Sequence, residues 1–179
     1  MSNFLEEFRK AKADPEVRYM LFKDALPTTP GWKSFWDYIE VSKTDGSYRS
    51  DHKGFYVIHT DAQKDLSAFS SAQDLMPKLR EIYQDEIDLV QLSLVVSEFA
   101  REETNLATGI QKHHDQQDTI HWACIGSSLW KIYKDDDSDE VIEECIVNPG
   151  DIFWARKGVT HNVESLHPRA ACIFIMHKG

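Results

Sequence analysis

The chain has 179 residues, of which 20 are Lys or Arg and 30 are Asp or Glu, so its formal charge is −10. Apolar residues make up 41% of the chain, which is ordinary for a globular domain and excludes a disordered chain. The acidic excess argues against binding to nucleic acid, because that affinity depends on Lys and Arg neutralising phosphates. No apolar run reaches the roughly 18 residues of a membrane span, and the charged start lacks the apolar stretch of a secretory signal. We therefore expect a single cytoplasmic domain over residues 1–179, without a nucleic-acid or membrane partner.

Residues 1–88 are predicted to form a mixed, partly helical layer. A short charged helix is expected at 3–13, as an arm, and FYVIH at 55–59 is typical of a strand. Apolar residues at helical spacing predict two amphipathic helices. In the second of them, Asp74 is the expected N-cap, three residues before Pro77. The helical spacing is that of Trp32, Phe35, Trp36 and Ile39 in the first helix and of Leu75, Leu79 and Ile82 in the second.

Residues 89–179 instead consist of short segments rich in β-branched and aromatic residues, separated by turns. The segments are LVQLSLVVSEF, TIHWACI, LWKIY, VIEECIV, DIFWA, HNVES and RAACIFIM. So many strands in so short a stretch leave no room for crossover helices, which excludes a parallel α/β sheet. We expect a mainly β fold, an all-β barrel or sandwich, with N-terminal helices.

Neither the cysteines nor the longest acidic run is predicted to bind a metal or to form disulfides. Cys124, Cys145 and Cys172 lie in apolar, strand-like stretches without a CxxC pair, which predicts buried free thiols. The run KDDDSDE at 134–140 lacks the Gly and Glu that a calcium-binding loop requires at fixed positions. It is therefore predicted to be a solvated hairpin loop.

A candidate metal site lies in the second half of the chain. His113 and Asp115 are two residues apart, so in an extended strand they point to the same side. With His161 from a distant strand they would form a face of two histidines and one carboxylate, which suits Fe(II) with open positions. His114 competes with His113, but strand alternation places it opposite Asp115. His121 is expected to line the pocket, because a fourth protein ligand would close an open position.

Two motifs of fixed spacing contain these residues. The first, HxDxxDxxxxxxxGxxxW, comprises His113, Asp115, Asp118, Gly126 and Trp130, and the second, PGDxxxxxxGxxH, comprises Pro149, Gly150, Asp151, Gly158 and His161. Over about residues 89–179 the chain resembles the cupin superfamily and, within it, the Jumonji-C-like hydroxylases. The resemblance implies a double-stranded β-helix, that is, a jelly-roll barrel. Arg156 stands where cupins usually carry Pro, so the turn there is expected to differ.

The resemblance also implies two cofactors, Fe(II) and 2-oxoglutarate. Jumonji-C-like hydroxylases usually place Lys or Arg fifteen residues after the first histidine, where it binds the distal carboxylate of 2-oxoglutarate; here that residue is Ser128. Arg169, eight residues after His161, is the expected replacement, and Lys131 is a weaker candidate. Thr119 stands where many cupins carry Glu. We expect Arg169, Thr119 and Ser128 to contact the co-substrate.

The implied activity is that of an Fe(II)- and 2-oxoglutarate-dependent dioxygenase, with His113, Asp115 and His161 holding the metal. The acidic charge favours a basic protein or peptide as the substrate. Two alternatives stay open. One is a metal-binding cupin enzyme, an isomerase or an O₂-dependent enzyme, that does not use 2-oxoglutarate; Ser128 favours it and the carboxylate ligand disfavours it. The other is a barrel that binds a ligand or partner without catalysis.

Overall fold

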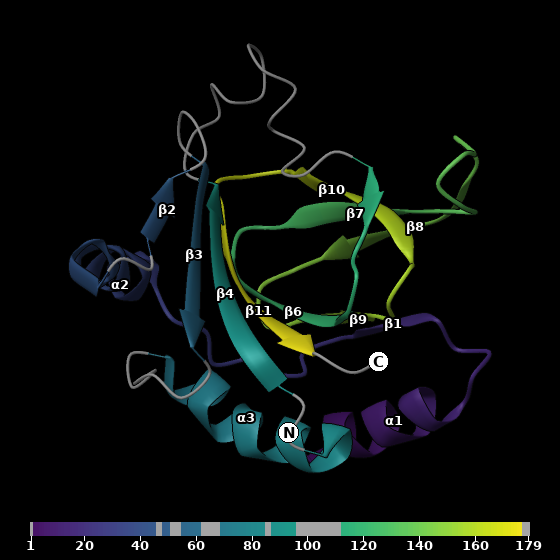
Figure 1. The fold of residues 1–179 in the computed structure, drawn as a ribbon, viewed down its shortest axis with the longest axis horizontal. Coiled ribbons are helices and arrows are strands. Elements are labelled where there is room, and N and C mark those ends of the chain that lie inside the picture. The colour runs from purple at the N-terminus through teal and green to yellow at the C-terminus, as the bar shows by residue number, and fades with distance from the viewer. Residues whose placement is uncertain are drawn as a thin grey trace.

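The computed structural model describes residues 2–45, 48–50, 55–61, 69–84, 87–95 and 112–176. Within these ranges lie three helices and eleven strands (Figure 1). The helices are α1 (Ser2–Ala13), α2 (Trp32–Asp45) and α3 (Ser70–Tyr83). The strands are β1 (Tyr19–Phe22), β2 (Tyr48–Ser50), β3 (Phe55–Asp61), β4 (Ile87–Val95), β5 (His113–His114), β6 (Asp118–Ile125), β7 (Ser128–Tyr133), β8 (Val141–Val147), β9 (Ile152–Ala155), β10 (Thr160–Ser165) and β11 (Arg169–Met176). None of the described helices is both long and apolar enough to cross a membrane.

The strands form two antiparallel sheets. One sheet has seven strands in the order β1-β9-β6-β11-β4-β3-β2, and the other has four in the order β5-β10-β7-β8. Strands distant in sequence are neighbours in both sheets, since β11 lies between β6 and β4, and β10 lies between β5 and β7. The arrangement is a jelly-roll barrel with N-terminal helices. It confirms the mainly β fold predicted from the sequence.

Both faces of strand β6 in the seven-stranded sheet are covered, which explains why residues 118–124 are all buried. On its inner face, Ala123 packs in a cluster with Trp130 of the smaller sheet. On its outer face, Trp122 packs in the cluster formed by the helices, and α1 and α3 lie side by side beneath this sheet in Figure 1. Strand β6, which follows the candidate ligand Asp115 in the chain, is therefore packed on both faces.

The first half of the chain differs from the prediction in three respects. Helix α1 is no free arm, because its apolar face, with Phe4 and Phe8, is buried against the sheet. Helix α3 begins at Ser70, so Asp74 and Pro77 lie inside it and Asp74 is not its N-cap. Burial of one apolar face of α3 outweighs the cost of an internal proline. Strand β1, which the sequence analysis did not predict, pairs with β9 at the edge of the larger sheet.

The cysteine and loop predictions hold with one exception. All three cysteines are free; Cys124 and Cys172 are buried, whereas Cys145 is only half-buried because it lies on β8, the edge strand of the smaller sheet. The acidic run connects β7 to β8, and its Asp residues are exposed. It is the solvated loop that the missing calcium ligands predicted.

Gly126 of the first motif occupies the turn from β6 to β7. Its φ of +64° lies in the left-handed region that favours glycine. A Cβ atom here would lie 2.3 Å from the backbone oxygen of Pro168. The motif requires glycine at this position because the loop before β11 crosses the turn at van der Waals distance.

Arg156, which replaces the usual proline of the second motif, joins the barrel to α1. Its guanidinium Nε donates to the carbonyl of Val17 at 2.7 Å, and its Nη2 donates to the carbonyls of Lys12 at 2.6 Å and Asp14 at 2.9 Å. The last carbonyls of a helix lack partners within the helix, so a cation there satisfies them and favours the helix dipole. Arg156 therefore links the N-terminal layer to the segment that leads into β10.

We expect Arg156→Met to lower the free energy of unfolding by about 1–3 kcal/mol, because it removes charged hydrogen bonds to several half-buried carbonyls. Urea denaturation followed by circular dichroism measures this change. The control is Lys157→Met at the neighbouring exposed side chain, which should change stability by less than about 0.5 kcal/mol. Equal losses in the two variants would contradict the role given to Arg156.

Candidate metal centre

Backbone pairing between β5 and β10 brings the two candidate histidines together. In this antiparallel pair, His161 lies directly opposite His113 and Thr160 opposite His114. Residues that face each other across such a pair project to the same side of the sheet. The His113 and His161 ring centroids are accordingly 4.5 Å apart.

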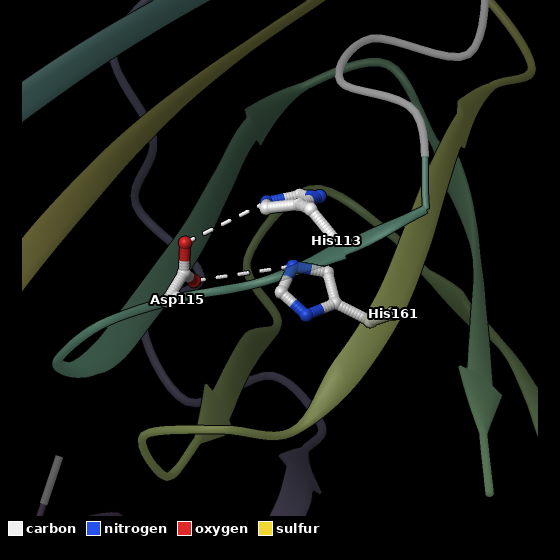
Figure 2. A group of neighbouring side chains, drawn as sticks. All are labelled: His113, Asp115 and His161. Carbon is white, nitrogen blue, oxygen red and sulfur yellow. Dashed lines mark ion pairs between the residues drawn. The ribbon is translucent and has the colours of Figure 1, made fainter. Parts of the chain in front are cut away.

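Asp115 follows β5 and turns its carboxylate toward both rings (Figure 2). Its Oδ1 lies 3.6 Å from Nε2 of His113, and its Oδ2 lies 3.9 Å from Nε2 of His161. One donor atom from each of the three side chains lies within 4.8 Å of the others. The backbone helps to hold this arrangement, because the amide of Gly158 donates to the carbonyl of Asp115 at 3.0 Å.

The hydrogen bonds around the three residues suit a metal centre. Nδ1 of His161 lies 2.9 Å from the carbonyl of Val159, and because a carbonyl only accepts, Nδ1 carries the hydrogen and Nε2 keeps its lone pair toward Asp115. The hydroxyl of Thr119 donates to Oδ2 of Asp115 at 3.1 Å. Partners of this kind orient the ligands of protein metal sites. Trp130 stacks on the His161 ring at 5.0 Å and fixes its plane.

The electrostatics of the centre favour the protonation states that bind a metal. Burial of Asp115 would raise its pKa, but the interactions with His113 and His161 outweigh burial and lower it. Burial lowers the pKa of His161, although the charge of Asp115 partly offsets this effect. An ionised carboxylate beside a neutral imidazole is the form that a divalent cation requires. The donor set, two imidazole nitrogens and one carboxylate, matches the face predicted for Fe(II).

His114, the alternative to His113, lies outside this group. Its Nδ1 forms an ion pair with Asp136 at 2.7 Å, and Asp136 also accepts from the hydroxyl of Thr160 at 2.6 Å. Strand alternation thus places His114 on the other side of β5 from His113, where it contacts the loop between β7 and β8. The contact ties the acidic loop to the two strands that carry the candidate ligands.

The residues predicted to contact a co-substrate lie on the inner faces of the barrel strands. Ser128 and Arg169 are 2% and 6% exposed. Nε of Arg169 donates to the hydroxyl of Ser165 at 2.8 Å, and Ser165 lies directly opposite Ser128 in the pairing of β10 with β7. Lys131, the weaker candidate, instead pairs with Glu164 at 2.7 Å.

His121 is buried near these groups, and neither of its ring nitrogens has a hydrogen-bond partner among the described residues. Its ring meets that of Trp130 edge-on, with centroids 5.1 Å apart. Burial and the charge of Arg169 lower its pKa to about 3. His121 is therefore neutral at physiological pH, and it is not one of the three residues whose donor atoms converge.

Sequence reasoning missed two of the groups that support the centre. The carbonyl of Val159 and the carboxylate of Asp136 carry no motif signal, because their roles depend on the folding of two turns. Asp118 and Asp151 of the two motifs do not join the centre. Asp118 accepts from the hydroxyl of Tyr83 and from the amide of Lys157, and Asp151 accepts from Lys23 and from the amides of Asp24 and Asn148.

No protein-family model matches the sequence, and no curated protein sequence matches it. Solved structures with a similar fold include YcfD, a ribosomal oxygenase from Escherichia coli, in complex with cobalt and succinic acid. The alignment has a TM-score of 0.67 and 16% identity, and it covers 96% of this chain and 51% of that chain. The structure of YcfD with cobalt and 2-oxoglutarate aligns with a TM-score of 0.66 and 16% identity over 96% of this chain and 52% of that chain.

The present chain thus spans about half the length of the ribosomal oxygenase that it matches. The likeness at 16% identity shows the fold alone, which is the jelly-roll barrel. This fold is the one that the resemblance to the cupin superfamily implied.

We expect His113→Ala to weaken Mn(II) or Fe(II) binding more than 100-fold, because loss of a direct ligand should exceed the 10- to 100-fold effect of altering its supporting partners. Calorimetric titration of the metal-free protein measures the affinity. His114→Ala is the matched control and should change the affinity less than about tenfold. Comparable losses of affinity in both variants would show that the assignment of His113 as the ligand is wrong.

We expect the metal-free protein to lose stability as the pH falls from about 6.5 toward 3, because His121 stays neutral in the fold while it takes up a proton when unfolded. Its contribution is complete above about 6.5 and decreases by as much as 1.4 kcal/mol per pH unit below it. Urea denaturation at pH 7, 6 and 5 gives the free energy of unfolding at each pH, and its slope against pH should be smaller for His121→Phe than for the original protein. Identical slopes in the two proteins would contradict a buried, neutral His121.

Proposed function

We propose that the chain is an Fe(II)- and 2-oxoglutarate-dependent oxygenase in which His113, Asp115 and His161 hold the metal. The observation that carries this proposal is the convergence of two imidazole nitrogens and one carboxylate within 4.8 Å, with the His161 tautomer set by Val159. Three protein ligands on one side leave positions for a co-substrate and O₂. The likeness in fold to an oxygenase whose structures contain cobalt and 2-oxoglutarate supports the same activity.

Bound Fe(II) and 2-oxoglutarate would supply the oxidising chemistry, in which O₂ converts 2-oxoglutarate to succinate and CO₂ as the substrate is hydroxylated. The chain would bind and orient the reactants. Thr119 would fix the carboxylate of Asp115, to which it donates a hydrogen bond, and Trp130 would fix the ring of His161, on which it stacks. The buried inner faces around these residues would keep water from competing with the substrate.

Arg169 would bind the distal carboxylate of 2-oxoglutarate in place of the cation that Ser128 does not supply. The guanidinium is buried, and burial lowers its pKa only to about 10, so it is charged at neutral pH. Its bond to Ser165 brings it to the strand pair that carries Ser128. The guanidinium of Arg169 on β11 would therefore reach the same part of the barrel as a Lys or Arg at position 128 on β7.

The proposed substrate class is a basic protein or peptide. The net charge of −10 favours a cationic partner by long-range attraction. The acidic loop between β7 and β8 contacts β5 through the pair of Asp136 with His114, and its carboxylates are exposed to solvent. A cationic segment that approached the centre would pass this loop.

A second candidate function is a metal-dependent cupin enzyme that does not use 2-oxoglutarate. Ser128 favours it, because a hydroxyl cannot neutralise a distal carboxylate. The two candidates differ in one measurable property, which is the affinity of the metal-loaded protein for 2-oxoglutarate.

We expect the Mn(II)-loaded protein to bind 2-oxoglutarate, and Arg169→Met to weaken this binding about 10- to 100-fold, since a hydrogen bond to a charged group is worth about 1.5–3 kcal/mol. Lys131→Met is the control, because that ammonium is paired with Glu164. Calorimetric titration gives the affinities, and release of succinate by the Fe(II) protein tests turnover. No binding by the original protein would favour the second candidate, and undiminished binding by Arg169→Met would place the anchor elsewhere.

A further inference from the structure

Two neighbouring strands carry buried polar groups that lack partners. Within the described residues, both ring nitrogens of His121 on β6 and Nη1 of Arg169 on β11 make no hydrogen bond. Both side chains are almost fully buried, at 5% and 6% exposure. Buried polar atoms in folded proteins are nearly always paired, because an unpaired one loses its hydration without compensation. Two such groups in one region indicate a ligand that both can bind.

The two side chains face the inside of the barrel from adjacent strands. His121 lies opposite Ile173, four residues along β11 from Arg169. Both contact the smaller sheet, since His121 meets the ring of Trp130 and Arg169 is bonded to Ser165. Among the charged groups around His121, Arg169 has the largest effect on its pKa, and that effect is to lower it. Among the described residues, no carboxylate accepts a hydrogen bond from Arg169, whose Nε is bonded to a neutral hydroxyl.

The chemistry of these groups selects an anion. Arg169 offers a free guanidinium N–H, and a neutral imidazole offers one N–H in either tautomer. A carboxylate has two oxygens and could accept from both donors while neutralising the buried cation. Trp130, which meets the His121 ring edge-on, limits how far that ring can turn away. A structural histidine of the core would already have a partner within the protein.

We propose that His121 binds the co-substrate directly, donating a ring N–H to the same distal carboxylate of 2-oxoglutarate that Arg169 binds. This inference rests on the proposed function and extends it to a residue that carries no motif signal for that role. It makes the distal end of the site a two-donor clamp. The clamp would select a 2-oxo dicarboxylate over a 2-oxo acid of the same length with one carboxylate.

The test compares two ligands on the Mn(II)-loaded full chain. 2-Oxoglutarate and 2-oxovalerate have the same five-carbon chain and the same metal-binding end, but only the first has a distal carboxylate. We expect His121→Phe to weaken 2-oxoglutarate binding about tenfold or more, the effect of one hydrogen bond to a charged group. Its affinity for 2-oxovalerate and for Mn(II) should stay within about twofold of the original protein. His121→Asn, which keeps an N–H donor, should recover part of the loss.

The outcomes separate this inference from the proposed function. If the original protein binds no 2-oxoglutarate, the proposed function fails and the inference fails with it. If it does bind and Arg169→Met weakens the binding, but His121→Phe leaves it unchanged, only the inference is overturned. Equal losses for both ligands, or a loss of Mn(II) affinity, would place His121 at the metal end and would also overturn it.

A second measurement is made on the original protein and so does not depend on the folding of His121→Phe. In ¹⁵N spectra of the original protein loaded with diamagnetic Zn(II), 2-oxoglutarate should shift the ring-nitrogen resonances of His121, assigned by comparison with His121→Asn. 2-Oxovalerate should leave them in place. Shifts of equal size with both ligands, or with neither, would contradict contact with the distal carboxylate.

Discussion

The candidate centre depends on the pairing of a two-residue strand, β5, with β10. That register sets His113 directly opposite His161, and the chain then needs only one further residue to bring Asp115 between them. A shift of one residue would replace His113 with His114, whose ring lies on the other side of the strand. So short a strand cannot set its own register. The Gly158 amide that bonds to Asp115 and the Asp136 contact to His114 set it from outside.

The helical layer supports the same centre from the opposite face of the larger sheet. The hydroxyl of Tyr83 on α3 donates to Asp118, and the other oxygen of Asp118 accepts the amide of Lys157. Arg156 binds the end of α1 one residue earlier. Both contacts hold the turn that leads to His161. The N-terminal helices therefore position a candidate ligand without contributing one.

The inside of the barrel combines apolar packing with a few polar groups, and only some of these groups have hydrogen-bond partners among the described residues. Ser128 accepts from the indole of Trp130, and Arg169 is bonded to Ser165, so part of the set is paired. His121 and one nitrogen of Arg169 are unpaired and buried. An unpaired buried cation destabilises a fold unless a ligand compensates it. The proposed contacts to the co-substrate therefore involve the buried polar groups that the described part of the protein leaves unpaired.

The sequence alone was enough to predict the strands of the second half and the mainly β fold, because strand alternation and turn glycines are local properties. Its two motifs, with the resemblance that they carry, named the three candidate ligands. One local prediction was wrong. Asp74 is of a residue type that favours N-caps, but burial of the apolar face of α3 starts that helix earlier, at Ser70. Only the tertiary structure decided which polar residues face one another. Arg169 is a strand-end arginine in the sequence, and the pairing of β11 with β6 buries it on the strand next to the one that carries His121. This pairing joins strands about fifty positions apart in the chain, so no pattern within one segment contains it.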